Sequence, residues 1–174
     1  MDRKLLKMLE SAYRKVVWNA ETAWPRECCG ALLGTRVDQQ EVVCEAMPAT
    51  GPQTATGRDF FQIGAQDMVA FHARATQNGW EILGFYHSHP DGPAAPSRAD
   101  LPRRIGEDAA QYGATWPEHC LLIASVQDRR LREVRAYRLT ADSGGGRSGD
   151  YGYEALEIAV IAADSPECDP SART

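Results

Sequence analysis

The spacing of apolar residues along the chain predicts a domain that mixes helices and strands. Apolar positions at three- and four-residue intervals predict amphipathic helices over residues 3–22 and 65–78. Ser97 is a suitable cap for a third helix that extends to about residue 112. Alternating or continuous apolar runs predict strands at residues 26–34, 41–47, 59–63, 80–89, 119–126 and 131–139.

The order of these elements favours an α/β domain, in which a central mixed β-sheet is flanked by helices in three layers. The first two strands are close enough in sequence to form a hairpin. Gly and Ser dominate residues 143–149, which predicts a flexible linker. We therefore expect a domain over residues 1–140 and an extension over residues 141–174. Within the extension, residues 151–163 are apolar enough to dock as one strand or helix, and residues 164–174 have the composition of a disordered end.

Composition and charge exclude some classes of function. The 174 residues carry a net charge of −5, which argues against nucleic-acid binding and would suit a basic partner. No apolar run approaches the ~20 residues of a membrane span, and the charged first residues do not form a signal peptide. Residues 129–138 carry a strip of arginines that we expect to be a solvated hairpin face and not a nucleic-acid site. The strip consists of Arg129, Arg130, Arg132, Arg135 and Arg138.

The chain has five cysteines, and none of them forms a Cys-x-x-Cys pair. Cys28, Cys44 and Cys120 fall in apolar runs, which predicts buried free thiols. Free thiols are typical of a reducing compartment, so we expect a cytoplasmic protein.

Two histidines stand at the end of the predicted strand over residues 80–89. Side chains alternate between the faces of a strand, so His87 and His89 should point the same way, about 6–7 Å apart along it. Asp100 follows in the first turn after the Ser97 cap, and a carboxylate brought back by that turn can be a third ligand. Two His and one Asp with an open fourth position describe a catalytic zinc site. Taken singly, Ser97 and Asp100 are also ordinary residues at a helix start.

These residues also match a known signature. His-Ser-His-Pro over residues 87–90, six further residues and then Ser97-x-x-Asp100 resembles the motif of the JAMM (MPN-plus) metalloproteases. A second motif, Pro-x-Glu-x-Cys-Gly-x-Leu-x-Gly over residues 25–34, resembles the upstream element of the same family. Position alone would make Glu27 a solvated residue at the mouth of a strand, but the second motif favours a functional role for it.

The resemblance covers roughly residues 1–140 and implies a fold and a site. The fold would be the cytidine-deaminase-like three-layer domain of the JAMM family, with the site at one sheet edge. One Zn²⁺ per chain would be held by His87, His89 and Asp100. Glu27 would accept the proton of the zinc-bound water, and Ser97 would help to hold the tetrahedral oxyanion.

The resemblance also implies a substrate class. Family members include ubiquitin-deconjugating enzymes and compact bacterial relatives that process ubiquitin-like or sulfur-carrier proteins. The short turn at residues 127–130 makes this chain look like the compact bacterial form. It would be a zinc (iso)peptidase that cleaves after the C-terminal Gly-Gly of a ubiquitin-like protein, in deconjugation or precursor processing. An adenylating and a conjugating enzyme would be further partners. The alternative is trimming of a sulfur-carrier protein in cysteine or siderophore biosynthesis.

Two readings of a different kind stay open. Two His and one Asp also form the facial triad of non-haem iron enzymes, although Glu27 and Ser97 would then have no role. Cupins use a His-x-His strand as well, but this chain has no downstream His at cupin spacing. A catalytically silent MPN scaffold is the second reading, although such domains usually lack the ligands. His119 is a weaker candidate ligand, and His72 is expected on a helix surface.

Overall fold

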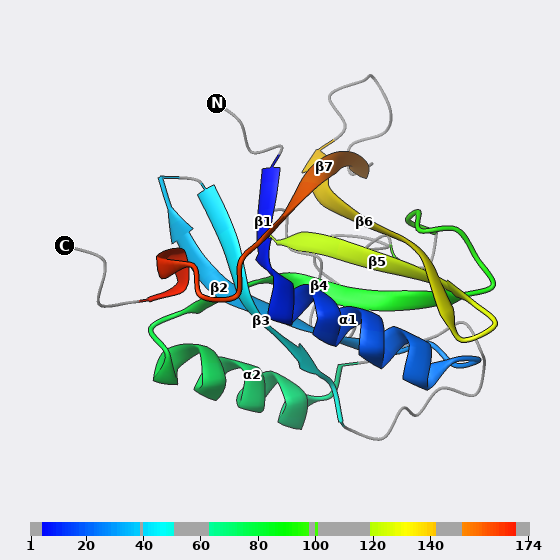
Figure 1. Ribbon diagram of the computed structural model, residues 1–174, viewed down its shortest axis with the longest axis horizontal. Coiled ribbons are helices and arrows are strands. Elements are labelled where there is room, and N and C mark those ends of the chain that lie inside the picture. The colour runs from blue at the N-terminus through cyan, green and yellow to red at the C-terminus, as the bar shows by residue number, and fades with distance from the viewer. Residues whose placement is uncertain are drawn as a thin grey trace.

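The computed structural model describes residues 5–38, 40–50, 63–97, 100, 119–141 and 151–169. Within these ranges, seven strands form a closed barrel in the order β1-β3-β2-β4-β5-β6-β7 (Figure 1). The strands are β1 (Leu5–Leu9), β2 (Cys29–Val37), β3 (Gln40–Pro48), β4 (Glu81–Pro90), β5 (Cys120–Gln127), β6 (Arg130–Ala141) and β7 (Tyr151–Ile161). The helices are α1 (Glu10–Ala23), α2 (Ala65–Gln77) and the short 3₁₀ helix η1 (Pro166–Cys168). None of these helices has the length and apolar character needed to cross a membrane.

The barrel contains both parallel and antiparallel strand pairs. β1 is parallel to its two neighbours, β3 and β7, and β4 is parallel to β5. The other four pairs are antiparallel. The mixed sheet expected from the sequence is therefore confirmed. The sheet differs from the expected flat middle layer, because β7 pairs with both β6 and β1 and so joins the two edges (Figure 1).

The prediction of a helix over residues 3–22 is wrong at its start, where residues 5–9 form β1 and α1 begins at Glu10. Leu6 and Met8 are fully buried and Lys7 between them is half-buried, which is the alternation of a strand. The leucines of this segment also satisfy helical spacing, so the local pattern fits both structures. Parallel pairing with β3 and β7 stabilises the strand, and that pairing depends on residues far away in the sequence.

Most other predicted elements are confirmed with small shifts in their bounds. β2 and β3 form the expected hairpin, and a tight turn through Asp128 and Arg129 joins β5 to β6. Residues 151–161 dock as a strand, β7. The helix expected after Ser97, the short strand at 59–63 and the linker at 143–149 fall wholly or almost wholly outside the described residues.

Different helices cover the two faces of β2. Val16 of α1 lies in the main buried cluster together with Leu32. Phe71 of α2 lies in a second cluster with Ala31 and Leu33. Because neighbouring residues of β2 alternate between the two clusters, both faces of the strand are buried. This explains why the segment is apolar throughout and lacks the alternation of a half-exposed strand.

A buried ion pair connects β3 to β6. Glu41 and Arg138 are only 3% and 7% exposed, and Arg138 donates to both carboxylate oxygens of Glu41. Arg36 donates to the same carboxylate. Arg138 therefore does not belong to a solvated strip, and that part of the prediction is wrong. Arg138 pairs with the buried Cys120 in the ladder, so its side chain points inward. There the ion pair with Glu41 offsets the cost of removing the guanidinium from water.

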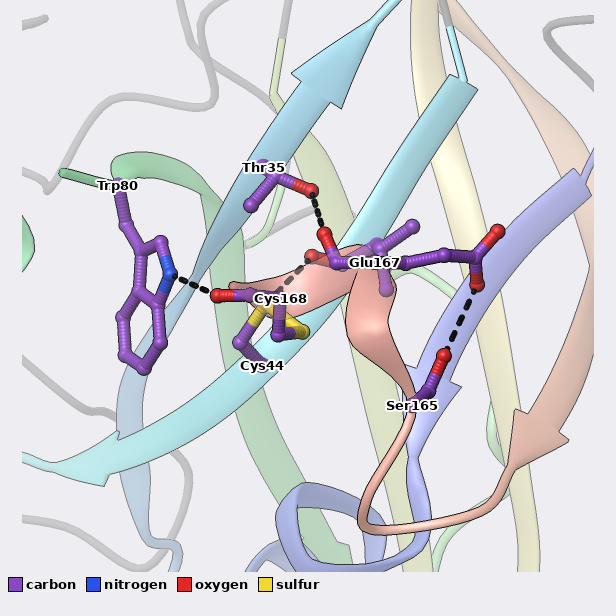
Figure 2. The surroundings of a disulfide bond; sticks show 7 residues. Thr35, Cys44, Trp80, Ser165, Glu167 and Cys168 are labelled. Carbon is purple, nitrogen blue, oxygen red and sulfur yellow. Dashed lines mark hydrogen bonds between the residues drawn. A yellow bond between two sulfur atoms is a disulfide. The ribbon is translucent and has the colours of Figure 1, made fainter. Parts of the chain in front are cut away.

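A disulfide between Cys44 of β3 and Cys168 of η1 fastens the C-terminal segment to the barrel (Figure 2). Beside it, Nε1 of Trp80 donates to the Cys168 carbonyl at 3.0 Å, and the Thr35 hydroxyl donates to the Glu167 carbonyl at 3.1 Å. The disordered end is expected to begin at residue 164, but the described structure continues through residue 169, because these contacts hold the segment in place.

The expectation of a free thiol at Cys44 is also wrong. Its apolar surroundings indicate burial correctly, but they carry no information about a partner that lies 124 residues away in sequence. Cys28 and Cys120 are free and buried, as predicted, and Cys29 is buried and forms no disulfide. Cys44 therefore no longer supports the expectation of a reducing compartment.

Reduction of this disulfide should destabilise the fold. Removing a link that closes so long a loop should lower the free energy of unfolding by about 2–5 kcal/mol. Chemical denaturation with and without reductant measures the loss, and alkylation of the unfolded, unreduced chain should label three of the five cysteines. A Cys44→Ala/Cys168→Ala variant is the control, since reductant should not change its stability. Labelling of all five cysteines without reductant would contradict the disulfide.

Candidate metal centre

Strand β4 presents two histidines on one face of the sheet. The Nε2 atoms of His87 and His89 lie 2.9 Å apart. Ser88 points to the other face, where its Oγ accepts the backbone N–H of Cys28 at 2.9 Å. The prediction that the two histidines share a face opposite to Ser88 is therefore confirmed, as the two-residue period of a strand requires.

Close packing fixes β4 between its neighbours. In the ladder, His87 lies opposite Cys29 of β2 on one side and Ile123 of β5 on the other. A Cβ at Gly84 would lie 2.1 Å from the carbonyl oxygen of Cys120, so only glycine allows β5 to approach this closely. Such packing leaves the backbone beneath the two histidines little room to shift.

Asp100 reaches the histidines from the loop that follows β4. Its Oδ1 lies 3.1 Å from Nε2 of His87, and its Oδ2 lies 3.7 Å from Nε2 of His89. The backbone N–H of Ser97 donates to Oδ2 at 2.6 Å, and the N–H of Asp100 donates to the Ser97 carbonyl at 3.1 Å. This reciprocal contact is of the kind that opens a helix, and it turns the carboxylate back toward the strand as predicted.

Burial and hydrogen bonding set the charges of the cluster. Burial lowers the pKa of His87 below its usual value, so the imidazole is neutral. Burial alone would raise the pKa of Asp100, but the contact with His87 and the Ser97 amide outweigh it and lower that pKa to about 2. Near neutral pH the cluster therefore combines an ionised carboxylate with a neutral imidazole.

The tautomer of His89 also suits metal binding. Its Nδ1 lies 2.8 Å from the carbonyl oxygen of Pro93. Because a carbonyl can only accept, Nδ1 carries a proton, and this contact directs Nε2 toward His87 and Asp100. A backbone carbonyl is a common partner for the second nitrogen of a metal-binding histidine.

The three side chains fit a metal ion in type and in spacing. Among the described residues, His87, His89 and Asp100 form a group whose ligand atoms all lie within 4.8 Å of one another. Tetrahedral Zn²⁺ with bonds of about 2.0–2.1 Å would separate its ligand atoms by about 3.3–3.4 Å. Nε2 of His87 lies 2.9 Å from Nε2 of His89 and 3.1 Å from Oδ1 of Asp100, both slightly shorter than that value, and the 3.7 Å from Nε2 of His89 is to the other carboxylate oxygen, Oδ2. Two imidazole nitrogens and one carboxylate oxygen are a donor set of catalytic zinc sites.

Glu27 lies just before β2. Cys28 exchanges hydrogen bonds with Ser88, and Cys29 is the partner of His87. Continuing this register by one residue places Glu27 opposite His89. Glu27 is half-buried. The sequence-predicted Ser97 contributes its backbone N–H to the Asp100 carboxylate, as described above.

Other candidates have different surroundings. His119 packs against the ring of Phe85, with the two centroids 5.8 Å apart, and does not belong to the ligand group. His72 is exposed on α2, as expected. Burial raises the pKa of the Cys28 thiol to about 11, so it stays protonated and is a poor nucleophile.

Sequence reasoning missed the side chains that hold the loop after β4. The Ser125 hydroxyl donates to the Gly92 carbonyl at 2.6 Å, and the Tyr137 hydroxyl donates to the Ala94 carbonyl at 2.6 Å. A third hydroxyl, from Tyr153, donates to the Asp100 carbonyl at 2.6 Å. Their only signal in the sequence is a polar group in an otherwise apolar strand, which is too common to identify them.

The barrel thus carries two histidines at the end of β4 and one aspartate from the loop that follows it. The profile of the prokaryotic homologs of the JAB domain matches residues 9–139. The chain belongs to that family.

Individual relatives agree with this assignment. A desampylase of Haloferax volcanii is 30% identical over 118 residues, which cover 68% of this chain and 73% of that protein. A solution structure of a protein from Salinibacter ruber has a TM-score of 0.62 and 29% identity, and the match covers 92% of this chain and 94% of that one. A solution structure from Desulfitobacterium hafniense has a TM-score of 0.69 and 22% identity, with 90% and 93% coverage, and it shows the shared fold.

Replacing a ligand should remove the metal and leave the fold intact. His87→Ala and Asp100→Ala should each lose bound zinc, because two remaining ligands hold the ion far more weakly. Elemental analysis of the purified proteins measures the metal, and circular dichroism reports the fold. His72→Ala, an exposed histidine on α2, is the matched control and should keep its metal. Full metal content in both ligand variants would exclude this site.

Proposed function

We propose that the chain is a zinc-dependent (iso)peptidase that hydrolyses the amide bond after the C-terminal Gly-Gly of a ubiquitin-like protein. The convergence of His87, His89 and Asp100 is the observation that carries the proposal. Membership of the JAB-domain family and the similarity to a desampylase support a hydrolase of this class. Deconjugation and precursor processing both fit, since the two reactions leave the same C-terminus.

The residues divide the reaction between them. His87 and His89 would hold the ion through Nε2, and Asp100 through its carboxylate. The bound ion would supply Lewis-acid polarisation of the scissile carbonyl and a lower pKa for its water. Glu27 would take a proton from the attacking water and pass it to the leaving amine. Ser97 would donate its hydroxyl to the developing oxyanion. The protonated thiol of Cys28 favours direct attack by water over a covalent thioester.

Three features favour the end of a protein chain as the substrate. His89 keeps some solvent exposure, and the loop after it carries the exposed residues Asp91 and Pro93. A Gly-Gly segment is slim enough for its backbone to approach a site set into a sheet. The net charge of −5 would attract a basic partner surface.

Glu27→Gln should abolish turnover and keep both the metal and substrate binding. Loss of a general base typically costs about 10²–10⁴-fold in rate.

Ser97→Ala should lower the rate less than Glu27→Gln and should act mainly on kcat, because the ion would carry most of the oxyanion charge. Steady-state kinetics on a ubiquitin-like fusion, with metal analysis of each variant, checks both expectations. Glu10→Gln, an exposed glutamate at the start of α1, is the control. Near wild-type turnover in Glu27→Gln would show that the base is another group.

The substrate can be tested with one pair of fusion proteins. A ubiquitin-like protein is joined to a reporter through its own Gly-Gly or through Ala-Ala in the same position. We expect release from the Gly-Gly fusion only, and we expect a chelator to abolish it. Gel analysis with mass spectrometry of the released fragment locates the cut. Equal cleavage of both fusions would be consistent with the proposed amide hydrolysis but would exclude specificity for Gly-Gly.

A further inference from the structure

Backbone carbonyls of the loop after β4 accept hydrogen bonds from side chains on three strands. Ser125 of β5 binds the Gly92 carbonyl, and Tyr137 of β6 binds the Ala94 carbonyl. Tyr153 of β7 binds the carbonyl of Asp100 itself, with a distance of 2.6 Å from its hydroxyl. The loop that delivers the carboxylate is therefore tied to the barrel at several points along its length.

The contact from Tyr153 differs from the other two, because it holds a metal-ligand residue directly. Asp100 is fixed from two sides: its Oδ2 accepts the Ser97 N–H, and its carbonyl accepts the Tyr153 hydroxyl. With both ends held, Oδ1 remains directed at Nε2 of His87, 3.1 Å away. Neither of these two contacts is with Oδ1, which faces His87.

Packing restricts the Tyr153 ring. It contacts the ring of Tyr137 edge to face, with centroids 6.2 Å apart and an interplanar angle of 72°. Tyr137 belongs to a buried cluster with Ala94, Leu121 and Ile123, and Tyr153 packs against that cluster. A ring held in this way loses little further side-chain entropy when its hydroxyl binds the loop. The hydroxyl is thus positioned before any metal arrives.

We infer that Tyr153 is a positioning residue for Asp100, so that the C-terminal strand β7 completes the metal centre. The inference rests on the proposed metal site. β7 follows the Gly- and Ser-rich residues 143–149 and lies beyond the segment that matches the family profile, residues 9–139. In this chain the strand closes the barrel and also supplies a hydroxyl to the residue that provides the carboxylate. Without that hydroxyl, the carboxylate would sample positions away from His87 and bind the ion more weakly.

Tyr153→Phe tests the inference, since it removes only the hydroxyl. Outer partners of metal ligands typically contribute 10–100-fold to metal affinity, and we expect a loss of about tenfold because the contact is to the backbone. Zinc affinity is measured by competition with a chromophoric chelator, well below the unfolding temperature of the metal-free protein. Cobalt(II) in place of zinc gives a second readout, because a displaced carboxylate changes the visible absorption bands. Unfolding of the metal-free variant should stay close to wild type.

Tyr86→Phe is the matched control. It removes a hydroxyl that accepts a hydrogen bond from Asn19 at 2.9 Å, and its ring lies in the main cluster on the other face of β4. We expect it to lower the stability of the metal-free protein and to leave zinc affinity and the cobalt spectrum unchanged. A general loss of packing would instead affect both variants alike.

The outcomes separate the inference from the proposed function. His87→Ala is included in the same titration. If His87→Ala loses zinc and Tyr153→Phe binds it about tenfold more weakly, both statements hold. If His87→Ala loses zinc and Tyr153→Phe binds it like wild type, the positioning role is wrong and the metal site stands. If His87→Ala binds zinc like wild type, the metal site is wrong and the positioning role falls with it.

Discussion

Strand β4 has to satisfy two opposite environments with consecutive residues, and the rest of the structure depends on that constraint. Tyr86 lies in the main apolar cluster, and Ser88 on the same face binds the backbone of Cys28. His87 and His89 alternate with them and face the loop that carries Asp100. A slip of one residue would exchange the two sets, turning imidazoles into the apolar cluster. Pairing with β2 and β5 on its two sides prevents that slip.

Two glycines, one in β4 and one in its neighbour β2, have a steric purpose. A Cβ on Gly84 would strike the carbonyl of Cys120, and a Cβ on Gly30 would lie 2.5 Å from the ring of Tyr86. Both contacts are shorter than nonbonded atoms allow, so any larger residue would push β4 away from its neighbours. The charges of the site depend on the same close packing. It excludes water from His87 and so keeps that imidazole neutral. One buried carboxylate beside it leaves a negative charge that a divalent cation would offset.

The sequence predicts best what local spacing controls. The His-x-His pair, the turn that returns Asp100 and the β2–β3 hairpin each depend on residues near one another in the chain, and the structure confirms them. β1 could not be predicted, because a short leucine-rich segment fits both the helical and the strand period. Only its pairing with β3 and β7 selects the strand. The pairs Glu41–Arg138, Cys44–Cys168 and Tyr153–Asp100 each join distant segments, and no spacing along the chain contains them. Closure of the barrel could not be predicted from local spacing either, because it depends on the pairing of β7 with β1.

The central claim is that His87, His89 and Asp100 hold one zinc ion through nitrogen and oxygen. X-ray absorption at the zinc edge of the purified protein tests it most directly. The account predicts about one zinc per chain, a first shell of nitrogen and oxygen only, and the outer scattering of two imidazole rings. Cys29 lies opposite His87 in the ladder, so a thiolate is the alternative donor to test for. A sulfur scatterer at about 2.3 Å, or no imidazole scattering, would contradict the account.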